Sequence, residues 1–325
     1  MAVLEKPQIF VCEIPLKYKF RGLNTREIVF FKGKYGWTEF SPFTEYGPSE
    51  SVTWLKAAYE AANLDLNEIS KKFVRFKVPI NVTIPQVSIA EIPGLLAQFP
   101  GCETVKLKVQ SFTESKGLLA ELITLIPRAR FRLDVNGGWN FSESMENLPN
   151  FLDFLGDRLD YVEQPVLALP DLKMIKQKLP IKIAIDESIR KSLHQISENI
   201  NYSEFADVAI LKWAPSGGLT ATLKLIDQIK LPVVISSALD SAVGLSFGLM
   251  LAQITENLYG PCGLGTSVFF QERITNDLEQ IIDGNMSFNQ INTLNIEKFS
   301  ASIERKQWWQ NRFDQVWEYF VNELN

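Results

Sequence analysis

A repeating alternation of short apolar runs and amphipathic stretches is the feature that most constrains how this chain can fold. The runs are rich in β-branched residues, and each ends in a polar or charged residue, at Lys108, Asp134, Glu163, Asp186, Lys212 and Ser237. Successive ends lie 23 to 29 residues apart, which is the length of one strand followed by one helix. This spacing predicts parallel strands joined by helical crossovers.

Eight strand candidates, between a run at 79–84 and a weak final run near 262–267, favour a closed α/β barrel. A doubly wound sheet is expected to carry a glycine-rich phosphate loop after an early strand, and the sequence contains no G-x-G-x-x-G or Walker-type motif. Residues 1–77 differ in texture, with alternating strands followed by one helix, and indicate a small α+β unit. We therefore predict three parts: the α+β unit over 1–77, the barrel over 78–283, and a final segment over 284–325.

Composition and charge narrow the class of partner. The 325 residues are 46% hydrophobic and 22% charged, with a formal net charge of -5, as in an ordinary globular protein. Because a net negative chain has no general attraction to phosphate backbones or anionic lipid, we expect a small-molecule substrate, no nucleic acid and no membrane surface. No protein partner is inferred. The start of the chain lacks the pattern of a signal peptide, which predicts a cytoplasmic location.

Few residue types are available for proton transfer or disulfide formation. Cys12, Cys102 and Cys262 fit neither a disulfide framework nor a zinc spacing, so we expect reduced thiols. His194 is the single histidine and is predicted to be an ordinary helix residue. Proton transfer must then fall to Lys, Asp, Glu, Tyr or Cys. Near the end of the chain, aromatic residues at four- and three-residue steps predict a helix with a core-facing stripe of Trp309, Phe313, Trp317 and Phe320.

Charged residues at the strand ends indicate one pocket. The carboxyl ends of barrel strands form the mouth where sites are built, and side chains two apart on a strand share a face. Isolated charges at such positions are often solvated loop residues, but charges at the end of apolar strands are costly to bury unless they are paired or metal-bound. Charges at six consecutive positions of this kind favour a functional site over a chance arrangement. The sets that share a face or a strand end are Lys106 with Lys108, Arg132 with Asp134 and Asn136, Glu163, Asp186 with Glu187, and Lys212.

The carboxylates of Asp134, Glu163 and Asp186 form an oxygen donor set suited to a hard divalent ion, which favours Mg²⁺ and leaves Mn²⁺ as the alternative. Such an ion can take up the charge that develops when a carbon acid beside a carboxylate loses its proton, and one lysine can be the base. Lys106 is expected to lower the pKa of Lys108 by repulsion between like charges.

An ordered set of motifs at these strand ends resembles the enolase superfamily, in its muconate-cycloisomerase-like branch. The motifs are Lys106-Leu107-Lys108, Asp134-Val135-Asn136, Glu163-Gln164-Pro165, Asp186-Glu187-Ser188 and Lys212. The resemblance implies a modified TIM barrel, (β/α)7β, with an N-terminal capping domain over 1–77 that the C-terminal segment over 284–325 completes. The branch includes cycloisomerases, racemases, epimerases and dehydratases, so the fold alone does not select the reaction.

Weaker signals resemble the o-succinylbenzoate synthases within this branch. Residues 20–27, with Arg21 and Arg26, are similar to that family's R-G-x-x-x-R-E loop, and Trp37-Thr38-Glu39-Phe40 departs from it where many relatives have Gly in place of Thr38. The alternative interpretation is that both arginines are solvated charges on a hairpin. The resemblance implies a set of substrate-binding residues made up of Arg21, Arg26, Arg132, Ser236, Ser237 and Gly265.

This second resemblance also implies a reaction, the dehydration of 2-succinyl-6-hydroxy-2,4-cyclohexadiene-1-carboxylate to 2-succinylbenzoate in menaquinone or phylloquinone biosynthesis. Lys108 would be the base, and Lys212 would stabilise the enediolate from the other face. Lys106 would tune Lys108, while Asn136 and Glu187 would lie near the metal ligands.

Three alternatives stay open. Lysines on both faces of a carboxylate substrate would also serve an amino-acid or dipeptide racemase or epimerase. A Schiff-base lyase could use Lys212 as a nucleophile on the same barrel. A non-catalytic binding protein is the third, and no feature of the sequence supports it.

Overall fold

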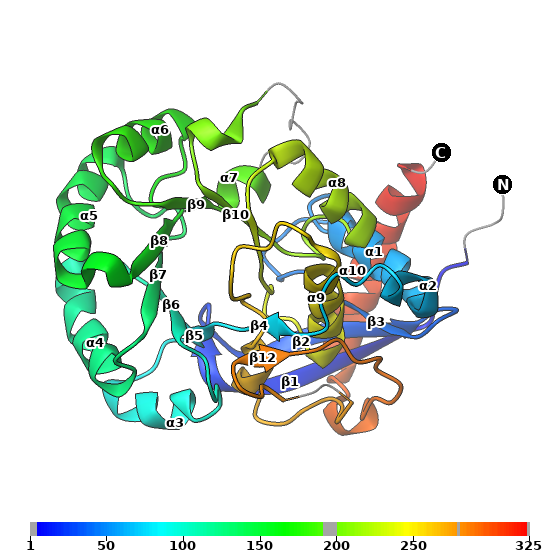
Figure 1. The fold of residues 1–325 in the computed structure, drawn as a ribbon. Helices are drawn as coiled ribbons and strands as arrows, with labels where there is room; N and C mark the ends of the chain where they lie inside the picture. Colours follow the sequence, from blue (N-terminus) through cyan, green and yellow to red (C-terminus); the bar gives the residue numbers. More distant parts are fainter. Residues whose placement is uncertain (1–4, 191–199, 278–279, 324–325) are drawn as a thin grey trace.

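The protein folds into a barrel of parallel strands wrapped by helices, with a small antiparallel sheet and the C-terminal helix beside it (Figure 1). This computed structural model describes residues 5–190, 200–277 and 280–323. The predicted helix around His194 lies outside the described residues. No helix in these ranges is long and apolar enough to cross a membrane.

The N-terminal sheet arises from the alternating segments of the first part of the chain. Its strands are antiparallel in the order β1-β2-β3, and their bounds are β1 (Ile9–Phe20), β2 (Leu23–Lys32) and β3 (Trp37–Phe40). The helices that follow are α1 (Val52–Ala62) and α2 (Leu66–Ser70). Both faces of the sheet are covered, because Ile28 and Phe30 lie on one face, Val29 and its partner Phe40 lie on the other, and all four are fully buried.

The C-terminal helix α10 (Ile303–Asn322) packs against the N-terminal sheet and α1. The predicted aromatic stripe is confirmed, since Trp309 and Phe313 are fully buried and Trp317 and Phe320 nearly so. The Phe313 ring contacts Phe40 with centroids 5.5 Å apart. Edge-to-face aromatic packing of this kind joins the two ends of the chain into one core.

The barrel strands run in sequence order, each hydrogen-bonded in parallel to the next. They are β5 (Val82–Ile84), β6 (Thr104–Lys108), β7 (Arg130–Asp134), β8 (Leu159–Glu163), β9 (Ile183–Ile185), β10 (Val208–Leu211) and β11 (Val233–Ile235). The helices around them are α3 (Ile92–Leu96), α4 (Phe112–Leu125), α5 (Phe141–Leu155), α6 (Leu169–Lys178), α7 (Glu187–Arg190), α8 (Leu219–Ile229) and α9 (Ala242–Ile254). The predicted alternation is confirmed.

The ring closes through the segment around Cys262, which takes the eighth position. Cys262 N–H donates to Pro79 O at 2.6 Å and Gly263 N–H to Ile235 O at 2.9 Å, so the segment bonds to both edges of the sheet. A short antiparallel pair, β4 (Val78–Pro79) with β12 (Asn285–Met286), lies at the start of the barrel. Closure removes the free edges of the sheet and brings the carboxyl ends of the strands to one mouth.

Candidate active site

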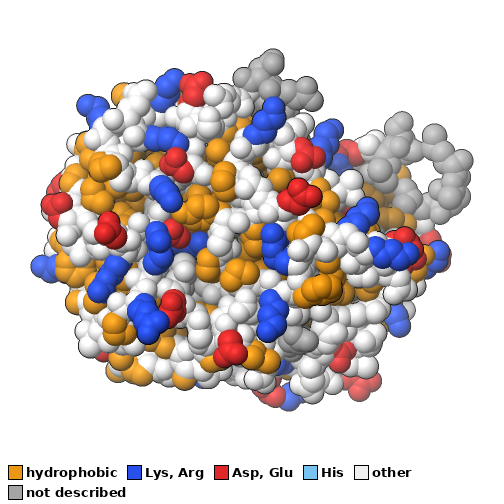
Figure 2. All heavy atoms as spheres, in the orientation of Figure 1, with side chains coloured by type: hydrophobic (Ala, Val, Ile, Leu, Met, Phe, Trp, Pro, Cys, Tyr) orange, Lys and Arg blue, Asp and Glu red, His pale blue; other side chains and the backbone are white. Residues whose placement is uncertain are grey.

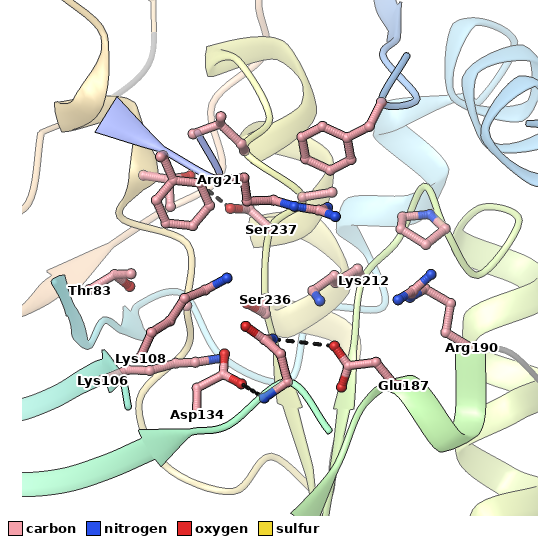
Figure 3. Close-up of a pocket in the computed structure, with 18 of the residues that line it drawn as sticks. Arg21, Thr83, Lys106, Lys108, Asp134, Glu187, Arg190, Lys212, Ser236 and Ser237 are labelled. Carbon is pink, nitrogen blue, oxygen red and sulfur yellow. Dashed lines mark hydrogen bonds and ion pairs between the residues drawn. The ribbon is translucent and has the colours of Figure 1, made fainter. Parts of the chain in front are cut away.

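A cavity of about 310 Å³ lies at the carboxyl ends of the barrel strands. Polar residues from the strand ends line it below, and Arg21 with aromatic residues of the N-terminal part lines it from the other side (Figure 3). Members of the strand-end set that line it are Lys106, Lys108, Asp134, Asn136, Glu187, Lys212, Ser236 and Ser237. The tertiary structure therefore brings together side chains from five strand ends that are far apart in the sequence.

Lys106 points from β6 into a cluster of carboxylates. Its Nζ donates to both carboxylate oxygens of Glu163 at 2.7 Å and lies 3.0 Å from Oδ2 of Asp134. Burial alone would lower the pKa of Lys106, but Asp134 and Glu163 outweigh it and raise this pKa well above its ordinary value. Lys106 is therefore a fixed cation.

Lys108 lines the cavity in a different environment. Burial lowers its pKa, and the charges of Lys106 and Arg21 lower it further, while Asp134 opposes the shift. Repulsion by Lys106 thus has the predicted direction, but burial is the larger cause. A lysine that is neutral closer to physiological pH is suited to be a general base.

Lys212 and Asp186 form an ion pair across neighbouring strand ends. Burial would lower the pKa of Lys212, but the Asp186 carboxylate raises it. Glu163 is fully buried, and this burial together with the nearby Asp134 charge raises its pKa to about 8. Crowded, desolvated carboxylates of this kind need positive charge beside them.

Two further residues support the strand ends. Asn136, in the left-handed backbone region with φ of 53°, donates its backbone N–H to Oδ1 of Asp134 at 3.0 Å. Its Nδ2 donates to Oε1 of Glu187 at 3.2 Å. The other oxygen of Glu187 is buried and has no hydrogen-bond partner within the described part of the chain. A buried carboxylate oxygen without a hydrogen-bond partner is available as a ligand for a cation.

Whether these residues fit a metal ion depends on the two lysines. Among the residues described, no three Asp, Glu, His or Cys side chains are gathered around one point as they stand. Instead the ammonium groups of Lys106 and Lys212 lie against Glu163 and Asp186. The donor set is nevertheless all oxygen, crowded and anionic, which is the chemistry a hard divalent ion needs. The residues fit such an ion if the two ammonium groups move aside.

Comparisons with known proteins agree with this architecture. Residues 11–62 match the family model described as enolase N-terminal domain-like, and residues 96–291 match the one described as enolase C-terminal domain-like. The chain is 35% identical over 311 residues to the o-succinylbenzoate synthase of Mycobacterium marinum, covering 94% of this chain and 92% of that protein. For the protein of that name from Mycobacterium tuberculosis, the identity is 34% over 320 residues, covering 97% of this chain and 95% of that protein.

The chain belongs to the o-succinylbenzoate synthase family. This family lies within the enolase superfamily, whose enzymes use a divalent metal ion. Among solved structures, the muconate lactonizing enzyme from Pseudomonas putida matches with a TM-score of 0.75 at 18% identity, covering 92% of this chain and 100% of that one. At this identity the likeness shows the fold alone, and it confirms the predicted modified barrel.

Three residues that the synthase resemblance suggested for substrate binding lie elsewhere. Arg26 is 2% exposed, and its guanidinium donates to the backbone carbonyls of Ser41, Ala238 and Leu239. Arg26 therefore neither contacts substrate from a loop nor lies on a solvent-exposed hairpin. The cause is the pairing of β2 with β1, which directs Arg26 into the interface between the N-terminal sheet and the barrel.

Arg132 and Gly265 are also packing residues in this member of the synthase family. Arg132 is 1% exposed inside the barrel, where Nε donates to Oδ2 of Asp160 at 2.8 Å. It lies one layer below Asp134, because residues two apart on a strand share a face. At Gly265 a Cβ atom would lie 2.6 Å from the Phe99 ring, so glycine is required there by close packing.

The predicted serines do reach the cavity, and the structure adds residues that strand-end reasoning missed. Ser236 and Ser237 line it, and the Ser237 hydroxyl is 2.7 Å from that of Thr266. Arg190, at the end of α7, also lines it. Its position three residues after Glu187 on one helix was the available signal, since such residues share a face. Aromatic residues from the N-terminal part complete the lining: Phe20, Phe43, Tyr46 and Trp54.

Proposed function

We propose that this enzyme catalyses the dehydration of 2-succinyl-6-hydroxy-2,4-cyclohexadiene-1-carboxylate to 2-succinylbenzoate, a step in menaquinone or phylloquinone biosynthesis. The observation that carries the proposal is the pair Lys108 and Lys212, which lie on different strands and line one cavity beside buried carboxylates. Family membership supports the choice of a hydro-lyase.

Lys108 is the base in this proposal. Its lowered pKa increases the fraction of neutral amine, which removes the proton alpha to the ring carboxylate. The resulting ammonium group then returns the proton to the departing hydroxyl on the same side, so one C–H and one C–O bond break, water leaves and the ring becomes aromatic. Lys212 stays protonated and stabilises the enediolate by its charge.

We propose Asp134, Glu163 and Asp186 as the residues that hold the divalent ion, with Mg²⁺ favoured and Mn²⁺ as the alternative. When bound, the ion supplies positive charge for the enediolate oxygens. Asn136 and Glu187 keep the ligands oriented through their hydrogen bonds. Lys106 keeps a fixed positive charge beside Lys108.

Substrate binding is assigned to the cavity walls. Ser236 and Ser237 offer hydroxyl groups, and Arg21 reaches the cavity from the turn between β1 and β2. We keep the three parts 1–77, 78–283 and 284–325 as the working division into capping domain, catalytic barrel and returning segment. A cytoplasmic location agrees with three free, buried thiols.

Incubation with the cyclohexadiene substrate and Mg²⁺, followed by ultraviolet absorbance, tests the reaction. Turnover by the parent enzyme and none by Lys108→Ala is the expected result, with Arg128→Met as a matched control because that arginine is 84% exposed and precedes the amino end of β7, whereas the cavity lies at the carboxyl ends of the strands. Turnover of the substrate without loss in Lys108→Ala would contradict the role of Lys108.

The racemase alternative is supported by the same pair of lysines, one on each strand end, and is tested by exchange of the alpha proton of N-acylated amino acids in heavy water. The Schiff-base alternative is tested by borohydride trapping. We expect no covalent adduct at Lys212, because its raised pKa disfavours the neutral nucleophilic amine.

A further inference from the structure

Arg190 is a cation that lines the cavity without an ion-pair partner in the described part of the chain, although its charge helps to lower the pKa of Asp186. It lies at the end of α7 and lines the cavity together with Lys212. Figure 3 shows its guanidinium directed into the cavity from α7, on the side away from Lys108. Across the described residues, this guanidinium makes no hydrogen bond or ion pair, and its Cζ lies 6.0 Å from the centroid of the Tyr46 ring.

The other arginines suggested for substrate binding are already engaged. Arg21 lies 3.2 Å from Oε1 of Glu45 and 4.1 Å from the centroid of the Phe43 ring, with its side chain 36% exposed. Its charge is therefore partly neutralised and partly screened by solvent. Arg26 and Arg132 are buried and hydrogen-bonded to the protein. Arg190 thus has the greatest capacity to bind an added anion.

An apolar wall adjoins Arg190. Tyr46 contacts Trp54 with ring centroids 5.3 Å apart and Phe43 with centroids 6.0 Å apart, and all three residues line the cavity. This aromatic wall, made of Phe43, Tyr46 and Trp54, offers contact for methylene groups and has no charge of its own. A ligand that extends from the lysines along this wall would end near Arg190.

We propose that Arg190 binds the second carboxylate of a dianionic substrate whose reacting end lies at Lys108 and Lys212 and whose aliphatic chain lies on the aromatic wall. This inference rests on the proposed function and specifies its substrate class. A guanidinium is suited to the task, because its planar N–H groups match the two oxygens of a carboxylate. Arg190 then determines specificity, and it takes no part in the chemical step.

Steady-state kinetics of Arg190→Met and Arg190→Lys provide the first test. Loss of an interaction made equally in the ground and transition states raises KM and leaves kcat nearly unchanged. We expect KM to rise about 10- to 100-fold in Arg190→Met, as for other hydrogen bonds to a charged group, and less in Arg190→Lys, which keeps the charge. Arg128→Met is the matched control and should have the parent KM. A parent-like KM in Arg190→Met would overturn the proposal.

Ligand binding by calorimetry separates this inference from the proposed reaction. The probes are 2-succinylbenzoate and 2-butyrylbenzoate, which differ in the distal carboxylate. The parent protein should prefer 2-succinylbenzoate, and Arg190→Met should lose most of that preference while its affinity for 2-butyrylbenzoate is unchanged. If the same preference persists in Arg190→Met, the inference is wrong even where the dehydratase is active. If the parent protein shows the Arg190-dependent preference but no dehydration, the reaction is wrong and the inference stands.

Discussion

The ammonium nitrogen of Lys106 lies 2.7 Å from both carboxylate oxygens of Glu163. It is also 3.0 Å from Asp134, so one cation already bridges two of the proposed metal ligands. A divalent ion and this ammonium group must then compete for the same oxygens. Removal of the ammonium in Lys106→Met should lower the Mg²⁺ concentration for half-saturation several-fold. Metal titration by calorimetry measures it, and an unchanged or weaker affinity would contradict the competition.

Loss of one carboxylate charge should weaken Mg²⁺ binding, which is the opposite of the effect expected for Lys106→Met. Asp186→Asn removes a ligand charge and also frees Lys212, so we expect activity to collapse at ordinary Mg²⁺ concentrations while the fold persists. Circular dichroism checks that the fold persists, and activity measured after chelation checks the dependence on the metal. Full turnover after exhaustive chelation would exclude a metal-dependent reaction.

The role of Lys212 is tested by the contrast between two substitutions. If this residue acts by charge alone, Lys212→Arg should retain a measurable fraction of kcat that Lys212→Ala loses, a difference of about 2 to 4 kcal/mol in transition-state stabilisation. Equal inactivity of both variants would favour a proton-transfer or covalent role for Lys212.

The pH dependence should report Lys108. A base must be neutral to act, so kcat/KM should rise with pH through an ionisation below the ordinary value of 10.5, because burial and nearby cations lower the pKa of Lys108. Arg21→Met removes one of those cations and should move this ionisation to higher pH. A profile that is identical in Arg21→Met would show that Arg21 does not act on Lys108.

A buried carboxylate in the interface between the N-terminal sheet and the barrel should make stability depend on pH. Asp240 is 1% exposed, and burial and the Glu39 charge raise its pKa to about 7, against the opposing effect of Arg26. The folded state then binds this proton more tightly than the unfolded state, so the free energy of unfolding falls as pH rises from 3.8 to about 7 and stays low above it.

Asp240→Asn should reduce this dependence and raise the free energy of unfolding above pH 7 by on the order of 1 to 3 kcal/mol. The part that remains comes from other buried carboxylates with raised pKa values, such as Glu163. Urea denaturation at pH 5 and pH 8 measures the effect. The exposed Asp153→Asn is the matched control and should keep the parental difference between the two pH values. If Asp240→Asn keeps the full parental difference between pH 5 and pH 8, Asp240 does not contribute to it.

Much of the barrel could be predicted because its signals are local. A β-branched run such as 208–211 is apolar along its length since both faces of a parallel barrel strand are covered, and the charged residue after it marks the mouth. The same logic placed Lys108, Asp134 and Lys212 at one cavity. The synthase resemblance implied substrate binding for Arg26 and Arg132, but both are buried and hydrogen-bonded to the protein, because a motif alone does not show whether an arginine faces ligand or the core.

The amino-acid sequence by itself determined the order of strands and helices, the position of the strand ends and the chemistry carried there, since periodicity and burial of apolar runs act over a few neighbouring residues. Only the tertiary structure decided which cationic side chains face the cavity and which are hydrogen-bonded within the protein. Arg26 is tied to carbonyls more than 200 residues away, whereas Arg190 is directed to the cavity beside aromatic residues of the N-terminal part. Such choices depend on how the N-terminal sheet packs on the barrel, because long-range packing sets the environment of each side chain.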